Sequence, residues 1–430
     1  MKTVTERWVL PNGLTVLYRL SPLMPLVSGT LLLKTGSYFE DNSQAGLASL
    51  TMDLLLAGTR RRTARQIADA VEFRGASLGV HASEDYSEMG FVAPSGQWSR
   101  VLDVLGDMLR YPTFPADEVA KERAQTLASL KSRNDSIFNL AHDRFSRMLF
   151  GSHPYSRPME GIPRTVRSFQ RKHFQTWRAS QLRPDRAIFS LIGPLPARQV
   201  IRGVTRFLGP WKTSDAHWIE PSLVSVPGPR ATIRAELRSR FEQAYLMTGT
   251  LAPAADDEGF ITLKVLNTLL GGGMSSRLFL RLREELGLAY EVASFFPTRL
   301  HPSQWVLYMG LPEEKLVLAE KKMEELLRQL AASGPTLQEV AQAKQMIAGA
   351  YLMEHQTRRR QGWYAAWWEF LGKGADYGSQ FLEEVEAVTP GDIHTLARRL
   401  LSQPRVTVTV VPSKNSLSPV RERVGVRGAR

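Results

Sequence analysis

The chain has 430 residues, is 43% hydrophobic and 23% charged, and carries a formal net charge of +13. It contains no cysteine, which excludes disulfide bonds, a thiolate nucleophile and cysteine-based metal sites. No apolar run approaches the roughly 18 residues of a membrane-spanning helix, and the N-terminal residues lack the apolar core of a secretory signal. We therefore expect a soluble protein of two or more domains without a membrane partner, cytoplasmic by default and periplasmic if a leader has been removed.

The excess of basic residues would attract nucleic acid or acidic peptides. The arginines are dispersed along the chain, and their groups do not alternate with aromatic residues as in a nucleic-acid-binding module. The sequence therefore favours an acidic ligand or an acidic partner over nucleic acid.

The first half of the chain alternates apolar runs with amphipathic segments. Two strands surround an Asn12-Gly13 turn within residues 8–18. Further strands are predicted at 27–34, 76–92 and 187–192, and helices at 44–57, 63–74, 95–109, 115–150 (one or two helices) and 162–180.

The pattern starts again after Pro210. Residues 213–230 contain three prolines and a glycine near their end, a composition typical of a linker. Strands are then predicted within 231–249 and a helix at 256–270.

Pairs of similar segments recur at a nearly constant spacing. Ala93-Pro94 precedes a predicted helix, as does Leu311-Pro312, 218 residues later. The apolar strand that ends at Pro194 has a counterpart ending at Pro412, again 218 residues on. The constant offset indicates a tandem duplication.

We therefore predict an α+β fold of two tandem α/β-sandwich halves. The predicted boundaries are 1–212 for the first half, 213–230 for the linker and 231–412 for the second half. Residues 413–430 are rich in basic residues and poor in hydrophobic ones, which predicts a disordered basic tail.

One stretch, residues 271–290, combines a sharp turn with two polar side chains. The glycines Gly271, Gly272 and Gly273 allow the backbone to turn and to approach a neighbour closely. Ser275 and Ser276 offer N-cap hydroxyls to a helix that would end at Gly287.

Arg283 and Tyr290 lie near the end of that helix, seven residues apart. A guanidinium and a phenol at this spacing could hold and polarise a carbonyl oxygen. The residues alone leave another interpretation open: Arg283 pairs with Glu284 or Glu285 on the surface, and Tyr290 simply starts a strand.

Other groups with catalytic potential are isolated. The eight histidines include no pair at the spacing of a helical metal site. Trp363, Tyr364, Trp367 and Trp368 form a cluster that is more typical of core or interface packing than of a ligand cage.

Several motifs together resemble those of the pitrilysin and mitochondrial-processing-peptidase family, over nearly the whole chain to about residue 412. They are Pro11-Asn-Gly-Leu-Thr-Val, Gly36-Ser-Tyr-Phe-Glu-Asp, Gly75-Ala-Ser-Leu, His153-Pro-Tyr-Ser-Arg157, Leu270-Gly-Gly-Gly-Met-Ser-Ser-Arg-Leu-Phe and Arg283-Glu-Glu-Leu-Gly-Leu-Ala-Tyr290. The resemblance implies two homologous halves of the processing-peptidase type.

The resemblance also implies where a zinc site would lie. In active members a helix carries His-x-x-Glu-His, whose histidines bind Zn²⁺ and whose glutamate activates water, and a further glutamate downstream completes the site. Here Ser49, Met52 and Asp53 stand at the motif positions, and Ser129 stands near the downstream position. The sequence therefore predicts no metal ligand set and no cofactor in this chain, and no peptide cleavage by the chain alone.

The family's arginine–tyrosine pair, by contrast, matches Arg283 and Tyr290. In the family this pair reaches across a closed chamber to the scissile carbonyl of the substrate. The resemblance implies a non-zinc subunit of a heterodimeric zinc endopeptidase that acts on unfolded peptides, with Gly271 to Gly273 as candidate substrate contacts. Zinc would belong to a homologous partner bearing His-x-x-Glu-His.

Three alternatives remain beside this interpretation. The chain could be a catalytically inactive structural or peptide-binding homologue. A mitochondrial presequence-processing role is less favoured than a bacterial peptidase subunit, because mitochondrial α-subunits carry a much longer glycine-rich loop. A lone protease with an unorthodox metal site is the least favoured.

Overall fold

The computed structural model describes residues 4–213, 226–413 and 421–426. The chain divides into two compact units, each built on a six-stranded sheet. Unit 1 comprises Met1–Leu130, Pro158–Leu223 and Leu352–Ser379, and unit 2 comprises Lys131–Arg157, Val224–Tyr351 and Gln380–Arg430.

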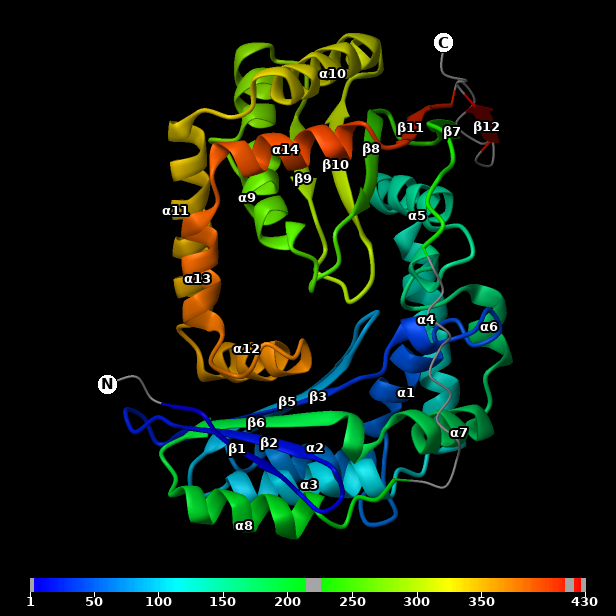
Figure 1. The fold of residues 1–430 in the computed structure, drawn as a ribbon. Helices are drawn as coiled ribbons and strands as arrows, with labels where there is room; N and C mark the ends of the chain where they lie inside the picture. The colour runs from blue at the N-terminus through cyan, green and yellow to red at the C-terminus, as the bar shows by residue number, and fades with distance from the viewer. Residues whose placement is uncertain (1–3, 214–225, 414–420, 427–430) are drawn as a thin grey trace. The chain divides into compact units, whose positions relative to one another are not determined.

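The sheet of unit 1 has the strand order β1-β2-β6-β3-β5-β4 (Figure 1). Neighbouring strands are antiparallel except for the parallel pair β2 and β6. The strands are β1 (Glu6–Val9), β2 (Thr15–Leu20), β3 (Leu26–Leu33), β4 (Ser77–Ala82), β5 (Ser87–Pro94) and β6 (Ala187–Gly193).

The sheet of unit 2 repeats this topology with the order β12-β7-β11-β8-β10-β9. Its single parallel pair, β7 and β11, corresponds to β2 and β6. The strands are β7 (Ile233–Ser239), β8 (Ala244–Ala252), β9 (Glu291–Phe295), β10 (Ser303–Leu311), β11 (Val406–Pro412) and β12 (Arg421–Val426). The equivalent order and direction of five consecutive strands confirm the predicted α+β fold and its duplication.

The sixth strand of each sheet comes from a different end of the chain. β1 precedes β2 at the N-terminus, whereas β12 follows β11 and pairs antiparallel with β7. Residues 421–426 therefore differ from the disordered tail predicted for 413–430. Val424 and Val426 favour extended backbone, and β7 would otherwise be an unpaired edge. The other residues of the predicted tail beyond Ser413 lie outside the described part.

Helices cover both faces of the sheet in unit 1. In Figure 1, α2, α3 and α8 lie on one side of this sheet, whereas α12 lies on the other and packs against β3, β5 and β6. The helices of this unit are α1 (Leu47–Leu55), α2 (Ala64–Glu72), α3 (Trp98–Arg110), most of α4 (Ala116–Arg133), α6 (Pro163–Ser168), α7 (Arg171–Gln181), α8 (Ala197–Leu208) and α12 (Arg358–Phe370).

In unit 2, α5 packs against β8 and β11, and α9 packs against β9. Arg234 of β7 donates two hydrogen bonds to Glu320 of α10, at 2.6 and 2.8 Å, and so ties this helix to the sheet. The helices of this unit are α5 (Ile137–Phe150), α9 (Gly259–Gly271), α10 (Leu316–Ser333), α11 (Leu337–Glu354, to Tyr351), α13 (Gly378–Ala387, from Gln380) and α14 (Pro390–Leu401).

The two halves of the sequence exchange one helix each. α5 begins at residue 137 and α12 at residue 358, and the difference of 221 is close to the 218-residue offset of the duplication. α5 belongs to the compact unit of the second sheet, and α12 belongs to that of the first. The compact units therefore do not coincide with the sequence halves. The halves 1–212 and 231–412 remain a prediction about the duplication, and most of the linker 213–230 lies outside the described residues.

The tryptophan cluster of α12 is part of the core of unit 1. Trp367 and Trp368 are 3% and 4% exposed. The rings of Trp363 and Trp367 lie 6.1 and 5.4 Å from that of Tyr86. Trp367 and Trp368 therefore pack in the core, as one of the two predicted kinds of packing requires, whereas Trp363 and Tyr364 are half-buried.

A buried carboxylate fixes the start of α1. Glu40 is 4% exposed and accepts hydrogen bonds from the backbone N–H groups of Gly46 and Ala48, at 2.9 and 2.7 Å. These N–H groups lie in the first turn of the helix, where no intrahelical acceptor exists. Glu40 therefore caps the helix on which the family's metal motif would lie.

We expect Glu40→Ala to destabilise α1 by about 2 to 4 kcal/mol, because two buried donors lose a charged acceptor. Hydrogen exchange of residues 46–55, followed by mass spectrometry, measures the loss of protection. Glu40→Gln keeps one acceptor oxygen and should lose less. Unchanged protection in the alanine variant would contradict the capping role.

In the described ranges no helix is long and apolar enough to cross a bilayer.

Candidate functional site

Arg283 lies in a short π-helical segment, Phe279–Glu285 (η4), anchored by the fully buried side chains of Leu278 and Leu282. Its own side chain is 45% exposed. The guanidinium lies 4.9 Å from the ring centre of Phe279, and its Nε is 4.0 Å from the Glu284 carboxylate. These contacts hold the guanidinium only loosely, so its N–H groups can donate to a ligand.

The alternative of a surface ion pair is only partly realised. The contact of Arg283 with Glu284 is at the outer limit of an ion pair, where the contribution to stability is small. Glu285 instead bonds to Arg281, one turn away. Arg283 is therefore the less constrained of the two arginines on this segment.

The π-helical turn that carries Arg283 was not predicted, because the sequence of this segment indicates an ordinary α-helix. The N–H of Leu288 bonds to the carbonyl of Leu282 at 2.8 Å, six residues back, and Gly287 has a φ of +56°. Because the chain turns back at Gly287, Leu282 and Leu288 are both buried, at 0% and 5% exposure. The predicted stop at Gly287 is confirmed, whereas the segment before it is a π-helix instead of the predicted ordinary helix, and its wider turn accompanies the burial of both leucines.

Tyr290 lies immediately before β9, the edge strand of the sheet in unit 2. Its backbone N–H bonds to the carbonyl of Gly310 on β10 at 2.9 Å, so the main chain is fixed. The side chain is 64% exposed and lines a surface recess that also contains Phe241 and Pro312. A phenol on a fixed backbone can offer its O–H to a ligand at a low cost in conformational entropy.

The three glycines of the predicted turn lie in different environments. Gly271 is buried at the last residue of α9, and a Cβ there would lie 2.3 Å from the backbone nitrogen of Ser294 on β9. Gly273 would place a Cβ against only the methyl group of Met346, at 2.8 Å. Gly271 therefore allows close packing of α9 on β9. The assignment of Gly271, Gly272 and Gly273 as substrate contacts stays a prediction.

The positions of the family's metal motif lie on α1 and α4. Met52 is 1% exposed and belongs to the core, whereas Ser129 is exposed on α4. Asp53 is half-buried, and this burial together with the nearby Glu122 carboxylate raises its pKa to about 6. Two carboxylates that repel each other therefore remain where a metal site would need several converging ligands.

Two family models match the chain in sequence and together span most of it. Residues 15–161 match the model described as "Insulinase (Peptidase family M16)", and residues 168–347 match "Peptidase M16 inactive domain". The chain belongs to peptidase family M16.

Relatives of this M16 chain are named as zinc proteases in several bacteria. The uncharacterized zinc protease YmxG of Bacillus subtilis is 25% identical over 412 residues, which cover 95% of this chain and 99% of that protein. The uncharacterized zinc protease Rv2782c of Mycobacterium tuberculosis is 27% identical over 434 residues, covering 98% and 97%.

Solved structures of other proteins share the fold of this chain. The peptidase M16 inactive domain from Pseudomonas fluorescens superposes with a TM-score of 0.86 at 21% identity, covering 95% of this chain and 98% of its own. A protease from Helicobacter pylori has a TM-score of 0.89 at 19% identity, covering 95% and 100%.

The residues of this M16 chain do not fit the zinc ion that active members of the family hold. Zinc requires three or more converging nitrogen, oxygen or sulfur ligands. Within the described ranges, no group of three or more histidine, aspartate or glutamate side chains could hold a metal ion. Asp53 is the single ligand-type residue among the four motif positions, and no catalytic step through zinc follows from this chain's own residues.

We expect Asp53→Asn to stabilise the protein at neutral and alkaline pH. Because the folded state holds this proton more tightly, its stability falls as pH rises from about 4 to about 6 and stays lower above that. The variant should gain up to about 3 kcal/mol at pH 8 and nothing below pH 4. Urea unfolding at several pH values measures the difference, with Asp69→Asn, at a half-exposed side chain of α2, as the control. Equal stabilities at pH 8 would contradict the cost of burying the charged Asp53 carboxylate beside Glu122.

Proposed function

We propose that this chain is the non-zinc-binding subunit of a heterodimeric zinc endopeptidase, to which it contributes Arg283 and Tyr290. The observation that carries the proposal is a loosely held guanidinium on η4 and an exposed phenol directly before edge strand β9, in an M16 chain whose metal positions are filled by other residues. The partner would be a homologous M16 chain that holds zinc with His-x-x-Glu-His.

Arg283 and Tyr290 would act on the carbonyl oxygen of the scissile peptide bond. Both side chains donate hydrogen bonds, and both donate more strongly to an oxyanion than to a neutral carbonyl. They would therefore bind the tetrahedral intermediate more tightly than the substrate, which lowers the barrier. The residues orient the carbonyl and stabilise its developing charge, whereas the attacking water would be activated in the partner.

Unfolded peptides are the proposed substrates. The outer edge of β9 carries backbone N–H and C=O groups that no strand of the described sheet pairs with. An extended peptide can bind such an edge through its main chain, largely independently of its sequence. A peptide held along β9 would pass close to Tyr290, the residue that precedes the strand.

The assembly tests the proposal. The isolated chain should bind less than about 0.1 equivalent of zinc and cleave no peptide. Co-expression with an M16 chain bearing His-x-x-Glu-His should give a stable complex that contains one zinc per heterodimer and cleaves an unstructured peptide. A chain that folds stably but forms no such complex would support the structural or peptide-binding homologue instead.

A further inference from the structure

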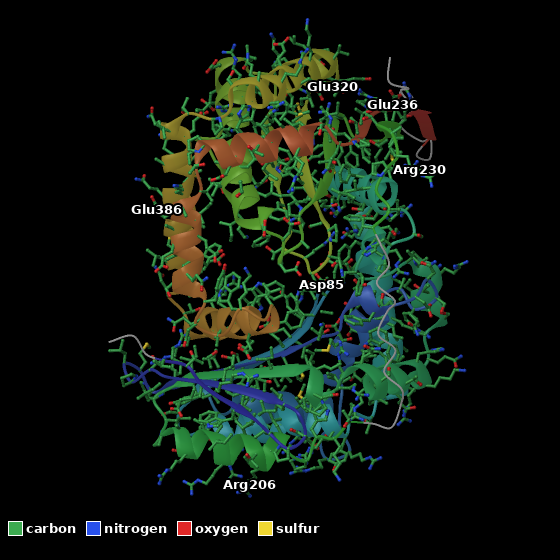
Figure 2. The ribbon with its side chains drawn as sticks, viewed as in Figure 1. Asp85, Arg206, Arg230, Glu236, Glu320 and Glu386 are labelled. Carbon is green, nitrogen blue, oxygen red and sulfur yellow. The ribbon has the colours of Figure 1, made fainter. Side chains whose placement is uncertain are left out.

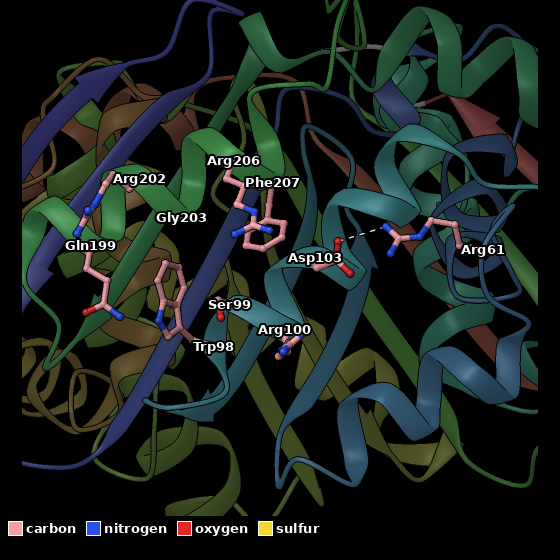
Figure 3. A pocket seen from close by; sticks show the side chains of 10 residues that line it. All are labelled: Arg61, Trp98, Ser99, Arg100, Asp103, Gln199, Arg202, Gly203, Arg206 and Phe207. Carbon is pink, nitrogen blue, oxygen red and sulfur yellow. Dashed lines mark hydrogen bonds and ion pairs between the residues drawn. The ribbon is translucent and has the colours of Figure 1, made fainter.

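In unit 1, α3 and α8 lie on the side of the sheet opposite α12 (Figure 1). A basic groove is lined by residues of these two helices and by Arg61. Arg61, Arg100, Arg202 and Arg206 line it, and Asp103 is its one carboxylate (Figure 3). We refer to these residues, with the floor residue Trp98, as the α3/α8 groove. None of them is used in the proposed peptidase function.

Among the described residues, most of the positive charge of the groove has no carboxylate partner. Asp103 already bonds to Arg62 at 2.5 Å and to Arg61 at 3.3 Å. In the part of the chain that the structure describes, Arg100, Arg202 and Arg206 form no ion pair with a carboxylate. Three guanidiniums therefore stand along one groove without a counter-charge.

The arginines of α8 form a row along one face of the helix. Arg198, Arg202 and Arg206 are spaced by four residues, so they lie one above the other, and Figure 2 shows Arg206 pointing outward from this helix. Like charges at this spacing destabilise a helix. The opposite face buries Val200, Val204 and Leu208 completely, so packing holds the helix in place despite the repulsion. An anionic ligand would relieve this cost.

The lack of an exposed aromatic ring in the groove favours a peptide ligand over single-stranded nucleic acid. Single-stranded nucleic acid binds by stacking its bases on exposed aromatic rings. Trp98 is 3% exposed because Gly203 of α8 lies directly against its ring. The ring of Phe207 is covered by the Arg206 guanidinium, 5.3 Å from its centre. The groove therefore offers charge without a stacking surface.

The spacing of the row matches an extended peptide. Residues four apart on a helix are separated by about 6 Å along its axis, and alternate side chains of an extended strand by about 6.6 Å. Carboxylates at alternate positions of a strand can therefore each meet one arginine of α8. Arg100 and Arg61 flank the groove from the α3 side.

We propose that the α3/α8 groove binds an acidic segment of a protein partner, with Asp or Glu at alternate positions of an extended chain. The contacts are ion pairs to Arg202, Arg206 and Arg100. The site is separate from Arg283 and Tyr290 and does not depend on their role.

Fluorescence anisotropy with the full chain tests the proposal. The probes are a labelled ten-residue peptide alternating Glu and Ser, the matching peptide alternating Gln and Ser, and a ten-nucleotide single-stranded DNA. The Glu peptide should bind at 50 mM NaCl and dissociate as the salt is raised, and the Gln peptide should not bind. The variant R100Q/R202Q/R206Q should weaken Glu-peptide binding by about tenfold or more.

A matched variant separates the groove from net charge. R164Q/R167Q/R171Q also removes three positive charges, but from exposed arginines elsewhere in unit 1. This variant should change the affinity by less than about twofold. Equal weakening by both triple variants would overturn the proposal, as would no binding of the Glu peptide. DNA that binds more tightly than the peptide and loses affinity selectively in the groove variant would also overturn it, in favour of nucleic acid.

Discussion

Arg283→Ala is expected to lower the kcat of the reconstituted heterodimer by about 100-fold and to leave KM nearly unchanged. Removing one donor to an oxyanion typically costs about 3 kcal/mol of barrier. An interaction that strengthens only in the transition state lowers kcat and kcat/KM together. Tyr290→Phe should lower kcat by about 10- to 100-fold for the same reason, and steady-state cleavage of an unstructured peptide measures both.

The control for Arg283 lies on the same turn. Arg281 is 51% exposed, close to the 45% of Arg283, but it is paired with Glu285. Arg281→Ala removes the same charge and should change kcat by less than about twofold. Equal losses in the two arginine variants would point to a general effect of charge or folding, and unchanged turnover in Arg283→Ala and Tyr290→Phe would refute the catalytic assignment.

Gly271→Ala is expected to destabilise unit 2 by about 3 kcal/mol. The new methyl group would lie 2.3 Å from the backbone nitrogen and 2.5 Å from the hydroxyl of Ser294, so α9 and β9 must separate. Overpacking of this kind costs about 1 to 3 kcal/mol or more. Because Tyr290 directly precedes β9, the variant should also lower the activity of the heterodimer. Urea unfolding and hydrogen exchange of residues 289–296 measure the two effects on structure.

Gly273→Ala is the matched control in the same run of glycines. Its methyl group would meet only the end of the flexible Met346 side chain. We expect a cost of less than about 1 kcal/mol and normal protection of β9. Equal effects of the two substitutions would contradict the close approach of α9 and β9 as the reason for glycine at residue 271.

Much of the fold follows from local pattern. The β1–β2 hairpin is predicted by the Asn12-Gly13 turn, and the equivalent strand orders of the two sheets follow from the constant offset of about 218 residues. The exchange of α5 and α12 between the two compact units cannot be predicted from local sequence pattern. An amphipathic pattern shows that a helix has an apolar face but not which sheet covers it, and two homologous sheets offer similar surfaces.

Only part of the candidate site could be predicted from the sequence. The motif that contains Arg283 and Tyr290 is visible in sequence because its residues are only seven apart. The repulsion between Asp53 and Glu122 joins residues 69 positions apart on two helices, and no local pattern reports it. The π-helical turn was missed because the apolar spacing of its leucines also fits an α-helix.

The arginines illustrate the same limit. The groups that stand out in sequence include Arg358 to Arg360, yet in unit 1 Arg358 donates to three backbone carbonyls and Arg360 pairs with Glu354. The row of Arg198, Arg202 and Arg206 has a helical spacing that could have been recognised. Which arginines remain without a counter-charge depends on the folded neighbours, which sequence alone does not give.

The central claim is that this chain supplies half of an active site. A titration tests it most directly: the zinc-binding partner is held at a fixed concentration, this chain is added in steps, and peptide turnover is followed. We predict no turnover from either chain alone and a rise that saturates at one equivalent, and no rise with the Arg283→Ala/Tyr290→Phe chain. Full turnover by the partner alone, or zinc-dependent turnover by this chain alone, would contradict the claim.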